Sequence, residues 1–147
     1  MKKKEIMVTV PRKVIKAFLG NLGEKLVEAA EEDNIKAVRF FIGVGDNVNA
    51  KDKYGNTSLT YAARTGNIDL AKFLLKKKAH MNTRNKGGDT PLTFASSYDS
   101  PGIAKFLLKK KAHVNTKNKN GSTPLTFATR YGYTEIIKLL RGAGGTE

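Results

Sequence analysis

Residues 88–95 read Gly-Asp-Thr-Pro-Leu-Thr-Phe-Ala, and residues 121–128 repeat this stretch with Ser in place of Asp. A related stretch, Gly-Asn-Thr-Ser-Leu-Thr-Tyr-Ala, occupies residues 55–62. Consecutive stretches are 33 residues apart, with no insertion or deletion between them. A fixed period of this length indicates one supersecondary unit stacked on copies of itself. Such arrays usually present a surface rather than carry out chemistry.

Each unit contains the same order of local signals, which residues 55–87 illustrate. Gly55 permits a left-handed turn, and Thr57 can cap the helix that follows. Small residues at positions 62 and 63 allow a neighbouring helix to come close, and Gly66 ends the first helix. An apolar stripe over residues 68–75 predicts a second helix. The unit is therefore expected to form a turn, a helix, a turn, a helix and a hairpin-like loop.

This order of elements, together with the Thr-Pro-Leu stretches, resembles the ankyrin repeat over about residues 22–147. The resemblance implies an all-α fold, an ankyrin-repeat α-solenoid of about four stacked repeats with an extra N-terminal helix. The last repeat is short, so it is either a terminal cap or the cut end of a longer array. The expected parts are a basic segment 1–21 with a helix at 11–20, a capping repeat 22–54, repeats 55–87 and 88–120, and a truncated repeat 121–147.

The chain departs from the ankyrin pattern at two kinds of position. The His that usually follows Thr-Pro-Leu is Thr here, so its hydrogen bond is either weaker or made by a hydroxyl. The Asp that usually opens the loop is Asn at two positions, which removes acidic residues. We expect a lower stability than that of a regular array. The positions are Thr60, Thr93, Thr126, Asn85 and Asn118.

The charge of the chain is strongly positive and unevenly distributed. The net charge is +14, and Lys and Arg are most in excess in residues 1–20 and 55–120, whereas residues 21–54 are slightly acidic. The chain has no Cys, which excludes disulfides and cysteine-bound metals. Pro11 interrupts the N-terminal apolar stretch before it reaches signal length, and no window is long enough for a membrane span. We expect a cytoplasmic protein, or one sent into a host by a specialised route.

The resemblance implies a concave binding surface made by the loop tips and the exposed side of the first helices. The expected partner is another protein, and the positive charge favours a partner with an acidic patch. Tyr and Arg are enriched among binding hot spots, and we expect the chain to be a monomer. The candidate partner-binding residues are Lys53, Tyr54, Arg64, Lys86, Asp89, Tyr98, Lys119, Arg130 and Tyr131.

Two lysine triplets at equivalent positions suggest an alternative function. They are expected to lie about 10 Å apart, on neighbouring second helices. The resulting basic ridge can meet acidic protein, nucleic-acid phosphate or anionic lipid, which makes electrostatic binding of nucleic acid or an anionic membrane the alternative. Charge at helix ends and solubility explain the same lysines more simply. The ridge consists of Lys76, Lys77, Lys78, Lys109, Lys110 and Lys111.

The sequence indicates neither catalysis nor a cofactor. His80 and His113 are one period apart, or about 10 Å, which is too far for a shared metal without further ligands. No catalytic triad or phosphate-binding loop is evident. Tyr61, Phe94 and Phe127 recur at the same period and are expected to pack between repeats, with stacking on a ligand as the alternative.

The segment from residue 11 to residue 22 can form an amphipathic helix. Its apolar side is expected to pack on the first repeat as an added cap, or alternatively to face a membrane surface or a partner's groove. The apolar residues are Val14, Ile15, Phe18, Leu19 and Leu22.

Overall fold

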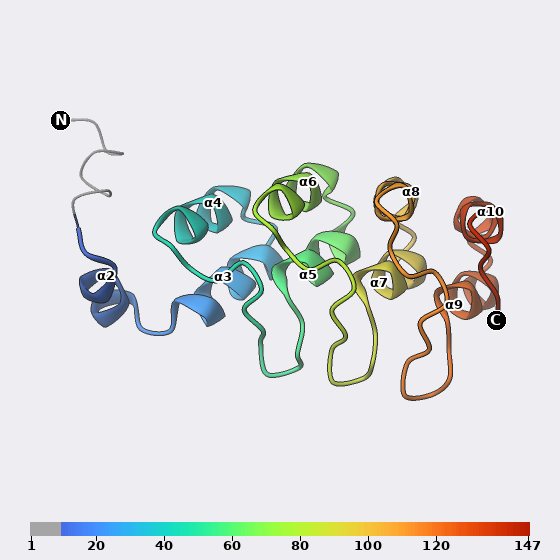
Figure 1. The fold of residues 1–147 in the computed structure, drawn as a ribbon, viewed down its shortest axis with the longest axis horizontal. Coiled ribbons are helices and arrows are strands. Elements are labelled where there is room, and N and C mark those ends of the chain that lie inside the picture. Colours follow the sequence, from blue (N-terminus) through green and yellow to red (C-terminus); the bar gives the residue numbers. More distant parts are fainter. Residues whose placement is uncertain (1–9) are drawn as a thin grey trace.

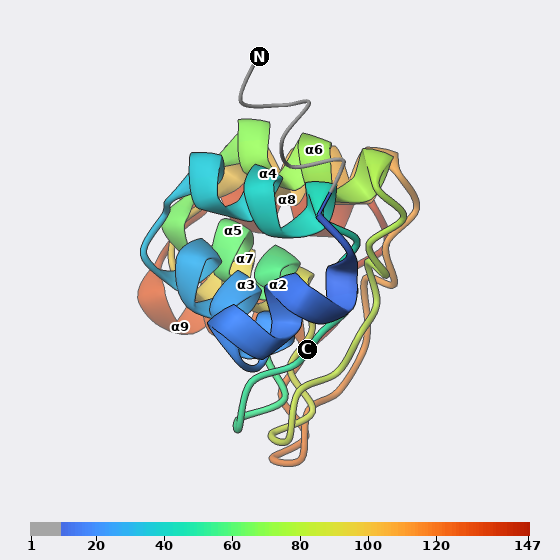
Figure 2. The same cartoon turned by 90° about the vertical axis from the view of Figure 1, so that its left-hand side faces the viewer.

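The computed structural model describes residues 10–147, and residues 1–9 lie outside that part. Its helices form two rows, with hairpin loops projecting from the side opposite the outer row (Figures 1 and 2). The described part of the chain contains no strand, which confirms the all-α solenoid. The inner row is α3 (Leu22–Glu31), α5 (Ser58–Thr65), α7 (Pro91–Ser97) and α9 (Pro124–Tyr131). The outer row is α4 (Ile35–Gly43), α6 (Ile68–Lys76), α8 (Pro101–Lys109) and α10 (Thr134–Gly142).

Helix α2 (Arg12–Leu19) lies at the N-terminal end of the stack (Figure 1). Ile15 is buried, whereas Val14 and Leu19 are exposed and Phe18 is 89% exposed. The expected packing of the whole apolar side is therefore found only at Ile15, and Leu22 is buried as part of α3.

Three of the four inner helices, α5, α7 and α9, begin at paired threonines that cap them reciprocally, whereas Asn21 caps α3. The Thr60 amide donates to Thr57 Oγ1 over 3.4 Å, and the Thr57 amide donates to Thr60 Oγ1 over 3.3 Å. The second Thr of each pair occupies the position where the ankyrin pattern usually has His, so a hydroxyl makes the hydrogen bond there. Each such cap stabilises a helix start by about 1 kcal/mol. The same reciprocal pairs are Thr90 with Thr93 and Thr123 with Thr126.

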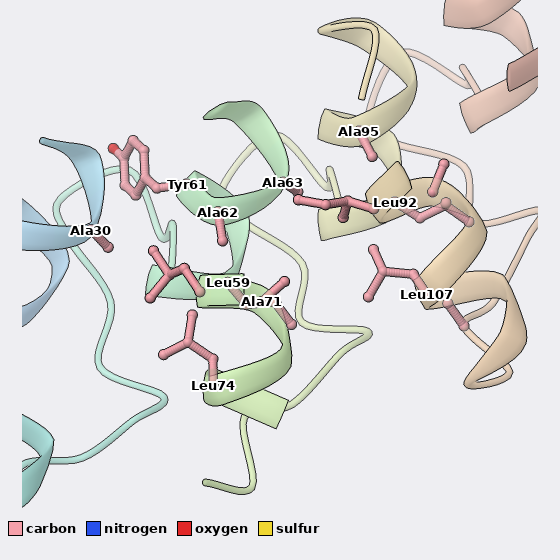
Figure 3. Packing of buried hydrophobic residues seen from close by; sticks show 14 of the residues in the cluster. Ala30, Leu59, Tyr61, Ala62, Ala63, Ala71, Leu74, Leu92, Ala95 and Leu107 are labelled. Atoms are coloured by element: carbon pink, nitrogen blue, oxygen red, sulfur yellow. The ribbon is translucent and has the colours of Figure 1, made fainter. Parts of the chain in front are cut away.

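Small residues allow the inner helices to pack closely on one another. Ala62, Ala95 and Ala128 are completely buried, and Leu59 and Leu92 fill the space between them and the outer row (Figure 3). Helix α5 packs between α3 and α7, and α7 packs between α5 and α9, while each outer helix packs on its own inner helix. The core is thus one continuous layer that runs the length of the stack.

Adjacent hairpins are linked by amide side chains at the positions where the ankyrin pattern usually has Asp. Asn85 Oδ1 accepts from the amides of Gly87 and Asp89, each over 2.9 Å, and Asn85 Nδ2 donates to Asn56 Oδ1 over 2.9 Å. In the next hairpin, Asn118 Nδ2 donates to Asp89 Oδ1 over 2.9 Å. A carboxylate in place of either Asn would lack this donor. The two asparagines therefore connect neighbouring hairpins.

Changing each of these asparagines to Asp tests this connection. Asn118→Asp should lower the free energy of unfolding by about 1–3 kcal/mol, because its new carboxylate would face the carboxylate of Asp89. Asn85→Asp should cost less, because its partner is the neutral amide of Asn56. Urea denaturation of both variants at neutral pH gives the comparison. An equal decrease in the free energy of unfolding of both variants would show that the side-chain contact between hairpins does not determine the destabilisation.

Candidate functional site

The exposed side of the inner helices and the hairpin bases line a groove, and one pocket of this groove lies between α7 and α9. This pocket has a volume of about 330 Å³, and four aromatic rings dominate its walls. It contains two of the predicted hot-spot residues, Tyr98 and Tyr131. The lining residues are Asp89, Thr93, Phe94, Ser97, Tyr98, Phe127 and Tyr131.

The two tyrosines are exposed, yet each is supported by another ring. Tyr98 stacks on Phe94 with ring centroids 5.9 Å apart and an interplanar angle of 10°, and it is 51% exposed. Tyr131 is 52% exposed, and its ring centroid is 5.7 Å from that of Tyr133. A side chain that is already held in place loses less conformational entropy when a partner binds. This pocket therefore has the properties of a binding hot spot.

The aromatic residues that recur at positions 61, 94 and 127 lie partly in the core and partly at the groove. Tyr61 is buried in the core, as the period predicts. Phe94 and Phe127 are only half-buried, and both line the pocket between α7 and α9. These two rings therefore belong to the candidate binding surface as well as to the packing between repeats.

Arginines flank the aromatic pocket on both sides. The Arg64 guanidinium lies 5.5 Å from the Tyr98 ring centroid and 5.9 Å from that of Tyr61. Its Nη1 atom is also 3.7 Å from Glu31 Oε1 on α3, so this side chain bridges three repeats. The Arg130 guanidinium lies 5.5 Å from the Phe127 ring centroid. Two exposed positive charges thus border the rings.

The hairpin tips carry a row of exposed lysines at one register: Lys53, Lys86 and Lys119. Backbone hydrogen bonds fix the spacing of this row, because the Lys86 amide donates to the Tyr54 carbonyl over 3.0 Å and the Lys119 amide donates to the Gly87 carbonyl over 2.9 Å. The Lys53 ammonium lies 5.1 Å from the Tyr54 ring centroid. The tips therefore form an ordered positive edge beside the groove.

Asp89 contributes to this surface in two ways. Its side chain lines the aromatic pocket, and its Oδ1 atom accepts the hydrogen bond from Asn118. The carboxylate therefore holds the next hairpin in position while it contributes to the pocket wall.

At the first repeat, the same groove is lined by carboxylates. A second pocket of about 370 Å³ lies between α3 and the first hairpin, and its residues Val27, Glu28 and Glu31 are equivalent to Thr93, Phe94 and Ser97 of the aromatic pocket. Four carboxylates line it, from Glu24, Glu28, Glu31 and Asp52. The groove is therefore acidic at one end and aromatic with flanking arginines at the other. The second pocket is lined by Glu24, Val27, Glu28, Glu31, Asp52, Lys53 and Tyr54.

A buried hydrogen-bond network holds the first hairpin against α5. The Tyr61 hydroxyl donates to Asp52 Oδ2 over 2.6 Å and lies 3.3 Å from Asn56 Nδ2. Asp52 Oδ1 accepts from the amides of Tyr54 and Asn56. Burial, together with the hydrogen bond to Asp52, raises the pKa of Tyr61 from 10.0 to about 12. The neutral hydroxyl thus stabilises the loop that carries Lys53 and Tyr54.

The predicted lysine ridge lies on the outer row rather than in the groove. Lys76 and Lys109 end helices α6 and α8, and both triplets are exposed. The groove and the ridge are therefore two separate surfaces.

The two histidines close the loops between repeats through their backbones. The His80 amide donates to Asn49 Oδ1 over 2.7 Å, and the His113 amide donates to Asn82 Oδ1 over 2.9 Å. Their side chains are exposed. Within residues 10–147, no group of three or more His, Cys, Asp or Glu side chains is placed to hold a metal ion. In the same range, no helix has the length and apolar character needed to cross a bilayer.

Stacked helical pairs with a long open groove define a repeat protein of the solenoid class. The family model described as Ankyrin repeats (3 copies) matches residues 26–118 and, in a second match, residues 84–146. The chain belongs to the ankyrin-repeat family, which confirms the resemblance seen in its sequence. Ankyrin repeats are generally modules that bind other proteins, and they are typically without enzymatic activity. A comparison with curated proteins found no match.

The hydrogen bonds of Tyr61 predict how the free energy of unfolding changes at alkaline pH. The folded state holds the hydroxyl proton of Tyr61 more tightly than the unfolded chain does. The stability that this hydroxyl contributes is therefore complete below pH 10 and is lost as the pH rises toward 12. Tyr61→Phe should cost about 1.5–3 kcal/mol at pH 7, because the bond to a carboxylate is lost, and should reduce the fall in stability between pH 9 and 12.

Denaturant titrations at several pH values measure this response. Tyr54→Phe is the matched control, because its ring is 57% exposed, and it should keep the alkaline response of the unmodified chain. A Tyr61→Phe variant that loses stability as steeply as the unmodified chain above pH 10 would contradict the assignment.

Proposed function

We propose that this protein binds another protein through the groove formed by its inner helices and hairpins, without catalysis. The observation that carries the proposal is the pocket between α7 and α9, where Tyr98 and Tyr131 are half-exposed and already supported by neighbouring rings. A partner side chain placed between them would bury aromatic surface at little entropic cost.

The charges around the groove favour a partner with an acidic patch. Arg64 and Arg130 flank the aromatic pocket, and the tip lysines form a positive edge beside it. The carboxylates near α3 favour a basic side chain at the opposite end. A groove with unlike ends accepts a partner in one orientation, because the reverse orientation places like charges together.

The chain is proposed to act as a monomer in the cytoplasm. It has no Cys, so its fold requires no oxidising compartment. Its core is completed within one chain by contacts between successive repeats.

Removing the two tyrosine rings tests the groove. Tyr98→Ala combined with Tyr131→Ala should weaken binding of a partner captured from an extract of the native cells by about a hundredfold, because each hot-spot ring contributes about tenfold or more. Affinity is measured by calorimetry with the purified partner, and circular dichroism checks the fold. The control is Phe18→Ala on α2, an exposed aromatic outside the groove. Unchanged affinity in the double variant would contradict the groove assignment.

The charge of the partner's patch is tested by kinetics. Replacing Lys53, Lys86 and Lys119 with Gln should slow association about tenfold and reduce its dependence on salt, because these side chains steer an acidic surface toward the groove. Stopped-flow mixing at two salt concentrations separates association from dissociation. Faster association of the variant would show that the patch is basic.

A further inference from the structure

A row of basic residues follows the outer helices at a single register. Arg39, Lys72, Lys105 and Lys138 occupy equivalent positions on α4, α6, α8 and α10, and all four are exposed. Neighbouring helices pack about 10 Å apart, so the row runs along the length of the stack (Figure 1). We call this row, together with the two lysine triplets, the outer basic face.

Part of the outer basic face is fixed on aromatic rings. Phe73 has the Arg39 guanidinium 4.3 Å and the Lys77 ammonium 5.8 Å from its ring centroid. One repeat later, Phe106 has the ammonium groups of Lys72 and Lys110 at 5.9 and 5.8 Å. Each ring thus holds two cations in place through its π surface.

Acidic residues do little to neutralise the outer basic face. Asp69 and Glu135 are the carboxylates on the four outer helices. Among the side chains that the structure describes, ion pairs join Lys25 to Glu28 and Arg64 to Glu31, on the inner row. The positive charge of the outer helices is therefore available to a partner.

Two lysines of the face occupy a backbone conformation that suits Gly. Lys78 and Lys111 have φ values of 70° and 69°, and the equivalent positions in the first and last repeats are Gly45 and Gly144, with φ values of 88° and 86°. A side chain is unfavourable in this left-handed region. Solubility and helix-end charge do not require lysine at these two positions, because the chain has many other lysines. Lys78 and Lys111 both add positive charge to the outer basic face.

The shape and lining of the face point to its partner. A groove of about 580 Å³ between α6 and α8 has an apolar floor and a rim of lysines. A ligand that carries both a negative group and apolar surface fits this combination, as a phospholipid does. The groove is lined by Lys72, Leu75, Lys76, Ala79, Met81, Phe106 and Lys110.

Nucleic acid fits the same face less well. Phe73 and Phe106 are half-buried beneath their cations, so they offer no free ring on which a base can stack. The lysines also form a two-dimensional array, because Lys76 lies one helical turn, about 6 Å, beyond Lys72, and the next helix lies about 10 Å away. An array of this kind matches the plane of a bilayer surface.

We infer that the outer basic face binds the surface of anionic phospholipid membranes. The hairpins lie on the opposite side of the stack from the outer helices, so the groove of the inner helices stays open to a protein partner (Figure 2). This inference does not depend on the proposed protein-binding function.

Binding to vesicles tests the inference with the full chain. Phosphatidylcholine vesicles containing phosphatidylserine should bind the chain in sedimentation assays, whereas pure phosphatidylcholine vesicles should not. One basic residue near an anionic surface contributes a factor of about five in affinity. Replacing Lys72, Lys76 and Lys105 together with Gln should therefore reduce binding about a hundredfold.

A matched control removes the same charge elsewhere. Lys25, Lys51 and Lys117 lie outside the outer basic face, and changing all three to Gln should reduce binding less than about tenfold at about 0.1 M salt, because charges farther than about 10 Å from the membrane are screened. Equal losses in the two triple variants, or no binding of the unmodified chain to anionic vesicles, would overturn the inference.

A second variant separates binding from stability. Changing Lys78 and Lys111 to Gly should leave the Tm equal to or above that of the unmodified chain, because it relieves two unfavourable conformations. The same variant should bind anionic vesicles about twentyfold more weakly. Unchanged vesicle affinity would count against the role of these lysines. Duplex DNA or RNA binding that depends on Lys72, Lys76 and Lys105, without vesicle binding, would assign the face to nucleic acid and overturn the membrane proposal.

Discussion

The close stacking of the inner helices is the constraint on which the rest of the structure depends. Ala62, Ala95 and Ala128 are fully buried where adjacent inner helices meet. A larger side chain at any of these positions would push adjacent repeats apart. Paired threonines start α5, α7 and α9 at the same register, so these three repeats add to the stack in the same way. One spacing and one register then determine where every exposed side chain lies.

Two surfaces with different chemistry follow from this constraint. A residue type that recurs at an exposed position becomes a row along the stack, as Lys72 and Lys105 do on the outer helices. A position that varies between repeats makes the surface change along its length. On the inner side, Glu28 and Phe94 occupy the same register two repeats apart, so the lining changes from a carboxylate to an aromatic ring. Recurring residues thus produce the outer basic face that we propose binds membranes. Residues that vary between repeats produce the groove that we propose binds another protein.

Much of the fold was predictable from the sequence, because the 33-residue period fixes the repeating unit and Thr57 marks a helix start. The contacts between repeats were harder to predict. Asn85 and Asn118 looked like lost acidic residues, yet each amide donates to a neighbouring hairpin, which local sequence does not show. Phe94 and Phe127 were expected in the core, but their exposure depends on how far the next inner helix covers them. The binding surface remains a prediction because partner chemistry depends on exposed residues outside the framework.

The separation of the two faces is the central claim, and hydrogen exchange of the chain in its two bound states tests it most directly. With anionic vesicles, amide exchange should slow in α6 and α8 and remain unchanged in the hairpins. With the protein partner, exchange should slow in α7, α9 and the hairpins and remain unchanged in α6 and α8. Protection of the same helices in both bound states would contradict the account.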